Sequence, residues 1–235
     1  MVKKINFSRH IEVLWLNQTA LWAADGLTKA EINDKINHML SSQINCKVNL
    51  GKTRNQLTSL WVDSNESIKS SFTETAVNLV HEYEELPLAL HFGLLVAKKK
   101  FFADVVRFIG RHSKLNESFT YAQAQKKVVE LYGDTETVKR SLRSVLKTLI
   151  ELGVIQRSDN RNYVVAKQKL AVPIKLKNWL LSAVLYSENA RSRTLSDLLD
   201  DAVWFPFEFY VDPAEIDKEL FEIHHQGNDE MLFLK

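Results

Sequence analysis

Residues 135–157 read TETVKRSLRSVLKTLIELGVIQR, and this stretch decides the fold that we expect. Its apolar residues recur at helical spacing between Thr135, which can cap a helix, and Gly153, which can end one. The apolar side consists of Val138, Leu142, Val145, Leu146 and Leu149. Two short β-prone runs follow within residues 154–165, joined by a polar turn. The stretch therefore predicts a helix that leads directly into a small β-hairpin.

Two more helices are predicted before this stretch. The residues from Tyr121 to Tyr132 predict a helix that Gly133 ends, and residues 101–114 predict another helix before it. Three helices followed by a hairpin with a basic and polar tip are the order of elements in a winged helix-turn-helix. We therefore expect a mainly α protein whose middle part is a winged helix-turn-helix with a small β-hairpin as its wing.

The first part of the chain predicts an N-terminal helical bundle. Thr28 and Glu31 form a capping-box pattern at the start of one helix, and residues 52–62 predict the next. These two helices can form a second helix-turn-helix, although the connection 41–50 is longer than the usual turn of about three or four residues. A plain helical-bundle connection is the alternative. The apolar segment 88–112 is expected to form the central core, as one long helix or two.

The last part of the chain predicts a mixed helical and β segment. Pro206 limits the aromatic run 204–211 to an edge strand or an irregular segment. The other expected elements are helices over 174–186, 195–201 and 213–221 and a strand over 231–234. We divide the chain into an N-terminal helical domain (1–97), a winged helix-turn-helix domain (98–170) and an acidic C-terminal segment (171–235) packed on the rest.

Composition excludes several classes of protein. Of 235 residues, 45% are hydrophobic and 26% charged, as in an ordinary globular chain, and seven glycines and four prolines are few for an all-β fold. The single cysteine, Cys46, permits no internal disulfide and no cysteine-based metal site, which favours a reducing compartment. No apolar run approaches the roughly 20 residues of a membrane span, and residues 1–10 lack the apolar part of a signal peptide. We expect a cytoplasmic protein.

The net charge of +2 hides a strong division along the chain. Residues 98–161 carry 14 basic and 7 acidic side chains, and residues 162–199 carry 6 and 2. Residues 200–235 carry only 2 basic but 10 acidic side chains. This asymmetry is typical of a nucleic-acid binder or of a protein with two differently charged partners. The alternative is a solvated surface whose parts neutralise one another.

The polar side of the predicted helix 135–152 carries the candidate binding residues. A cationic helix face with short hydroxyls fits the major groove of duplex DNA, where it can reach guanine edges and phosphates. A solvated helix face is the alternative, but only Glu136 and Glu151 supply the acids that such a face usually alternates with its cations. The candidates are Lys139, Arg140, Arg143, Ser144 and Lys147 on this helix, Lys126 and Lys127 before it, Arg157, Asn160 and Arg161 on the hairpin, and Lys52 and Arg54 in the N-terminal part.

No pattern of catalytic or metal-binding residues is complete. His81 and Glu82 begin a zinc-protease pattern, but Glu85 stands where its second histidine belongs. A phosphate-binding loop ending at Thr53 would need an earlier glycine where Cys46 stands. The acids from Asp212 to Asp217 suit a nuclease only on neighbouring strands, whereas we expect a helix there. We therefore expect a protein that is not an enzyme and has no metal or cofactor.

The phrase Leu142-Arg143-Ser144-Val145-Leu146, followed by Leu149 and Gly153-Val154-Ile155, and the order of elements over residues 28–165 resemble the BrxA family of bacteriophage-exclusion (BREX) systems. The resemblance implies a monomeric binder of double-stranded DNA with two helix-turn-helix elements that works beside a methyltransferase and an ATPase. Other defence proteins are then partners for the acidic C-terminal segment. The alternative function is a protein-interaction adaptor that uses a winged-helix scaffold and that acidic surface.

Overall fold

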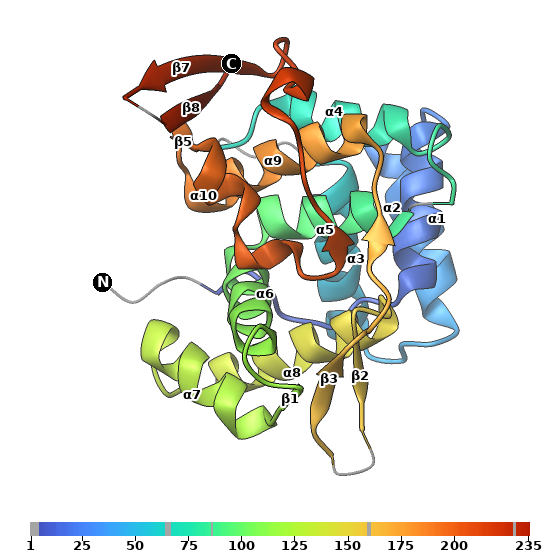
Figure 1. Cartoon of the computed structure of the whole chain (residues 1–235). Helices are drawn as coiled ribbons and strands as arrows, with labels where there is room; N and C mark the ends of the chain where they lie inside the picture. The colour runs from blue at the N-terminus through green and yellow to red at the C-terminus, as the bar shows by residue number, and fades with distance from the viewer. Residues whose placement is uncertain (1–4, 64–66, 86, 159–160, 228) are drawn as a thin grey trace.

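The computed structural model describes residues 5–63, 67–85, 87–158, 161–227 and 229–235, and it is mainly helical, as expected (Figure 1). The helices are α1 (Val13–Ala24), α2 (Lys29–Ser41), α3 (Lys47–Trp61), α4 (Ser70–Leu79), α5 (Pro87–Lys98), α6 (Lys100–Ser113), α7 (Tyr121–Tyr132), α8 (Glu136–Glu151), α9 (Ile174–Glu188) and α10 (Leu195–Leu199), with short 3-10 turns η1 (Ala202–Trp204) and η2 (Pro213–Glu215). The strands are β1 (Ser118–Phe119), β2 (Ile155–Arg157), β3 (Tyr163–Val165), β4 (Leu170–Ala171), β5 (Ser192–Thr194), β6 (Phe207–Glu208), β7 (Phe221–Gln226) and β8 (Asp229–Leu234).

Helix α5 lies at the centre of the core, and nearly all of its residues are buried. It crosses α9 closely because Gly93 has no side chain: a Cβ at this position would lie 2.2 Å from the Trp179 ring. Trp179 in turn stacks on Phe72 of α4, with 4.8 Å between the ring centroids. The apolar segment 88–112 therefore forms the core as predicted, and it does so as two helices, α5 and α6.

Residues 100–165 form a unit of three helices and a small sheet, in the order α6, β1, α7, α8, β2, β3. The strands are antiparallel and β3 lies between β1 and β2, so that Tyr163 pairs with both Phe119 and Arg157. The bounds of α7 agree with the prediction, and Gly133 after it has a φ of 86°. Helix α8 begins after Thr135, whose hydroxyl accepts a hydrogen bond from the Val138 amide at 3.3 Å. The predicted helix and hairpin are therefore confirmed.

One predicted helix start is wrong, and one predicted helix does not form. Helix α3 begins at Lys47 rather than at residue 52, so the connection from α2 has five residues, 42–46. Gly51 lies inside α3 because the packing of Leu57 and Leu60 in the core outweighs the low helix propensity of a single glycine.

The predicted helix 213–221 is also absent, since only the single turn η2 forms there. The Asn178 side chain of α9 donates to the Glu215 carbonyl at 2.9 Å and accepts from the Asp217 amide at 2.8 Å. These bonds take backbone groups that a helix would use. Phe221 instead begins β7, where it pairs with Leu234 of β8.

The remaining C-terminal elements agree with the mixed segment that we expected. Strand β8 confirms the predicted strand at the end of the chain and pairs with both β5 and β7. Strand β6 pairs in parallel with β4, so the aromatic run is the edge strand that Pro206 allows. Helix α6 holds the segment: Arg107 donates to Asp201, and Gly110, which has no side chain, lets the Ala202 carbonyl approach closely.

Candidate nucleic-acid interface

The exposed side of α8 presents three cations in a row. Val138, Leu142, Val145, Leu146 and Leu149 are buried where α8 packs on α6, α7 and β2, so the opposite side, which includes the exposed Ile150, faces solvent. Arg140, Arg143 and Lys147 are exposed on that side at successive spacings of three and four residues, which places them along one stripe. Among the described residues, none of the three has a carboxylate within 4.0 Å. We call these three residues the α8 triad.

The other predicted cations near α8 are partly neutralised. Lys139 forms ion pairs with Asp134 at 2.8 Å and with Glu136 at 3.6 Å. The hydrogen bond that Lys139 donates to Asp134 raises the pKa of Lys139. Lys127 is paired with Glu130 at 3.1 Å, whereas Lys126 of α7 is exposed. Ser144 is half-buried beside the triad. Among these described cations of α7 and α8, the triad and Lys126 therefore carry the positive charge that no carboxylate neutralises.

Two tyrosines connect the triad to the hairpin. The Arg143 guanidinium lies 5.7 Å from the centroid of the Tyr121 ring, and that of Arg157 lies 5.9 Å from the Tyr163 ring. The Tyr121 hydroxyl donates to the Lys139 carbonyl at 3.3 Å, which fixes α7 against α8. Burial raises the pKa of Tyr121, and the neighbouring Tyr163 contributes to that rise. Arg143 and Arg157 therefore belong to one surface formed by α7, α8 and the hairpin of β2 and β3.

The tip of the hairpin carries one more predicted residue. Arg161 is exposed and has a φ of 62°, a left-handed conformation that closes the turn. Its amide donates to the Ser158 carbonyl at 3.0 Å, and the Ser158 amide donates to the Asn162 carbonyl at 2.9 Å. Asn160 lies outside the described residues.

The two predicted residues of α3 point in different directions. Lys52 is exposed. Arg54 donates to Asn37 of α2 at 3.4 Å and to Asn55 at 3.2 Å, so its guanidinium lies over the α2–α3 contact. Lys52 and Arg54 therefore do not form one binding face.

Sequence reasoning missed one neighbour of the triad. The Lys147 ammonium lies 3.0 Å from Nε2 of His10, a residue that precedes α1. The two residues are 137 positions apart in the chain. No local pattern connects residues at that separation, so only the folded chain brings them together.

The acidic C-terminal segment leaves the triad uncovered. Asp200 pairs with Lys114 at 2.8 Å, and Asp201 pairs with Arg107 and Arg193 at 3.1 and 2.9 Å. In the described part of the chain, no hydrogen bond or ion pair of residues 200–235 reaches α8. The basic and acidic parts of the sequence therefore meet at α6 and β5 rather than on the predicted binding face.

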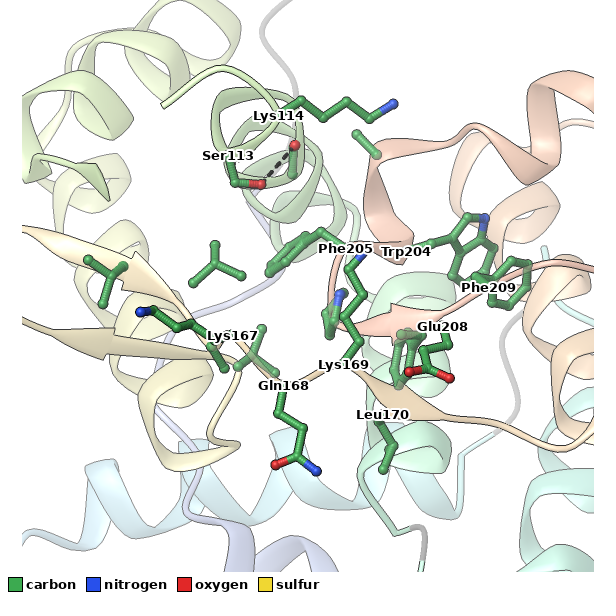
Figure 2. Close-up of a pocket in the computed structure, with 18 of the residues that line it drawn as sticks. Ser113, Lys114, Lys167, Gln168, Lys169, Leu170, Trp204, Phe205, Glu208 and Phe209 are labelled. Carbon is green, nitrogen blue, oxygen red and sulfur yellow. Dashed lines mark hydrogen bonds between the residues drawn. The ribbon is translucent and has the colours of Figure 1, made fainter. Parts of the chain in front are cut away.

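An open cleft of about 1340 Å³ lies between the hairpin, the end of α6 and residues 199–209. Figure 2 shows Phe205 projecting toward the middle of the cleft, with Lys167 and Glu208 on opposite sides. Lys114 in the same cleft is already paired with Asp200. Because both signs of charge line it, the cleft suits a polyanion less well than the α8 triad does.

The described residues contain no group of three or more His, Cys, Asp or Glu side chains placed to hold a metal ion. None of their helices has both the length and the apolar character that crossing a membrane requires. Comparison of this chain with protein-family models, with curated proteins and with solved structures finds no match.

Proposed function

We propose that this protein is a non-enzymatic binder of duplex DNA and that α8 enters the major groove. The observation that carries the proposal is the α8 triad: three exposed cations on one helical stripe, with no carboxylate in ion-pair range among the described residues. Exposed lysines and arginines on a helix usually alternate with acids, and Lys139 and Lys127 do so in this chain. A stripe of free cations is suited to phosphates and to guanine edges.

The order of elements from α6 to β3 supports a winged helix-turn-helix interpretation of residues 100–165. In that interpretation α8 is the recognition helix, and the hairpin of β2 and β3 is the wing that places Arg157 and Arg161 against the DNA backbone or the minor groove. Lys126 on α7 then contacts a phosphate beside the groove. The contact of Arg143 with Tyr121 and that of Arg157 with Tyr163 support one continuous face made by helix and wing.

The proposal is tested by measuring duplex affinity after removal of the triad. Replacing Arg140, Arg143 and Lys147 together by alanine should weaken binding of a random-sequence duplex by at least about two orders of magnitude, because three strong contacts at roughly 1–3 kcal/mol each contribute about 3 kcal/mol or more. Fluorescence anisotropy at low salt measures this loss.

The control variant replaces three exposed cations outside this face, Lys167, Lys169 and Arg191, so that the change in net charge is the same. It should bind nearly as tightly as the wild-type protein. Equal loss in both variants would mean that only net charge matters, and unchanged binding by the triad variant would refute the proposal.

The resemblance to the BrxA family extends this proposal to a role in phage exclusion, beside a methyltransferase and an ATPase. In a host that carries such a system, the triad variant should then restrict phage less than the control variant does. Plaque counts on the two strains measure the difference, and equal counts would separate DNA binding from defence.

A second candidate function is a protein-interaction adaptor. Asp200 and Asp201 form ion pairs within the chain, but other acids of residues 200–235, such as Glu219 and Glu222, are exposed. These exposed acids favour the adaptor. An adaptor of this kind should bind a basic partner and should show no affinity for duplex DNA. The anisotropy measurement described above therefore distinguishes the two functions.

A further inference from the structure

A short extended segment, residues 7–12, runs between α3 and α8 before α1 begins, and we call it the strap (Figure 1). Gln56 of α3 holds it by accepting from the amides of Ser8 and Arg9 at 3.1 and 3.2 Å. Its side-chain amide also donates to the Arg9 carbonyl at 2.7 Å. Phe7 and Ile11 are completely buried, so the strap is anchored on both sides of these bonds.

The other side of the strap is bonded to α8. The Ile11 amide donates to the Thr148 hydroxyl at 2.9 Å, and Lys147 of the triad donates to the His10 ring. Burial lowers the pKa of His10, and the charge of Lys147 lowers it further, so the neutral ring accepts this hydrogen bond. Glu12 and Glu151 also act on His10, in the opposite direction. The strap therefore fixes α3 beside the C-terminal half of α8.

The strap places two more cations beside the triad. Asn49, Lys52 and Gln56 lie on one stripe of α3, and the first and last of them contact the strap. The Arg9 guanidinium donates to the Asn49 side chain. A hydrogen bond from the Asn49 backbone lowers the pKa of the nearby Cys46, and the charges of both Arg9 and Lys52 add to this effect. Arg9 and Lys52 are therefore neighbours at the start of α3.

We infer that the strap joins α8 and α3 into one cationic surface, and that a single duplex lies along it and contacts Arg9 and Lys52 in addition to the triad. This inference rests on the proposed DNA binding. It differs from a separate helix-turn-helix of α2 and α3, because Arg54 faces α2 and has no part in the surface. In the described part of the chain, neither Arg9 nor Lys52 forms an ion pair with a carboxylate; Lys52 is exposed, and Arg9 is half-buried with its guanidinium on Asn49.

The size of the added contact follows from the geometry of the chain. Strap residues advance by at most about 3.8 Å each, and neighbouring turns of a helix lie about 5–6 Å apart. The path from Lys147 through His10 and Arg9 to Lys52 is therefore on the order of 15 Å. At about 3.4 Å per base pair, the strap and α3 extend the contact by roughly four or five base pairs.

Duplexes of increasing length test this inference with two matched variants of α3. Lys52→Ala removes a cation of the joined surface, and Arg54→Ala removes a cation two residues away that faces α2. Lys52→Ala should leave the affinity for short duplexes unchanged, lower the affinity for long duplexes about tenfold, and reduce the salt dependence by about one unit. Arg54→Ala should match the wild-type protein at every length. Titration with a long duplex should give one duplex per protein.

The outcomes separate this inference from the proposed function. Equal effects of Lys52→Ala and Arg54→Ala at every length, or two duplexes bound per protein, would overturn the joined surface. The DNA-binding proposal would still stand in those cases if the triad variant loses affinity. Conversely, unchanged binding by the triad variant would refute the proposed function whatever the two α3 variants do.

Discussion

Asp201 should be the most sensitive charged residue of this fold. Its carboxylate is 5% exposed and accepts from Arg107 Nε at 3.1 and 3.2 Å, from Arg193 at 2.9 Å and from the Val203 amide at 3.0 Å. Burial alone would raise the pKa of Asp201, but the charge of Arg107 and these hydrogen bonds hold it below its ordinary value. The carboxylate therefore ties the start of the acidic segment to α6.

Asp201→Ala leaves the Arg107 guanidinium buried without its main counter-ion, since that side chain is only 6% exposed. Glu188 at 3.2 Å and Ser187 at 2.9 Å are the partners that remain for its Nη2 atom. Breaking a buried ion pair on one side costs about 3–5 kcal/mol, a large share of the roughly 5–15 kcal/mol that stabilises a typical domain. We expect the melting temperature to fall by about 6–20 °C.

Urea denaturation of Asp201→Ala, Arg107→Met and the double variant measures this coupling. The double variant should be more stable than Asp201→Ala alone, because removing both charges leaves no unpaired arginine at position 107. A loss below about 1 kcal/mol for Asp201→Ala, or strictly additive effects in the double variant, would refute this reasoning.

Two further predictions concern stability. Gly110→Ala should lower the free energy of unfolding by about 1–3 kcal/mol, because its Cβ would lie 1.9 Å from the Ala202 carbonyl oxygen. Gly51→Ala in α3 should raise it by about 0.5–1 kcal/mol, because the added Cβ meets no atom within 4 Å and alanine favours the helix. Burial lowers the pKa values of Lys98 and Lys99 to about 8, so the unfolded chain binds more protons than the folded one between pH 8 and 10.5. The free energy of unfolding should therefore rise with pH in that range. Urea titrations of Lys99→Met should show a flatter rise, and an unchanged slope would contradict the burial of that charge.

The sequence predicts the middle of the chain well because its signals there are local. Thr120, Gly133, Thr135 and Gly153 mark the ends of α7 and α8, and caps of this kind act within one helical turn. The apolar stripe then fixes which side of α8 is buried. Exposure of the triad follows from that stripe, and the structure agrees with it.

What the sequence does not predict depends on partners that are distant along the chain. Asn178 replaces the expected helix at 213–221 with bonds to two backbone groups about 40 positions away. The strap is a stronger case, because its contacts with Gln56 and Thr148 span 47 and 137 positions. No local sequence pattern indicates that Lys52 lies beside Arg9 or that Arg54 lies against α2.

The most direct test of DNA binding by α8 is the dependence of the duplex association constant on salt concentration. A protein that neutralises phosphates releases counter-ions, and log K falls with log salt by about 0.9 per phosphate contact. If each member of the triad neutralises one phosphate, replacing Arg140, Arg143 and Lys147 by alanine should reduce the slope by about 2.7. The same slope for the triad variant and the wild-type protein would contradict the assignment of α8 as the DNA-binding element.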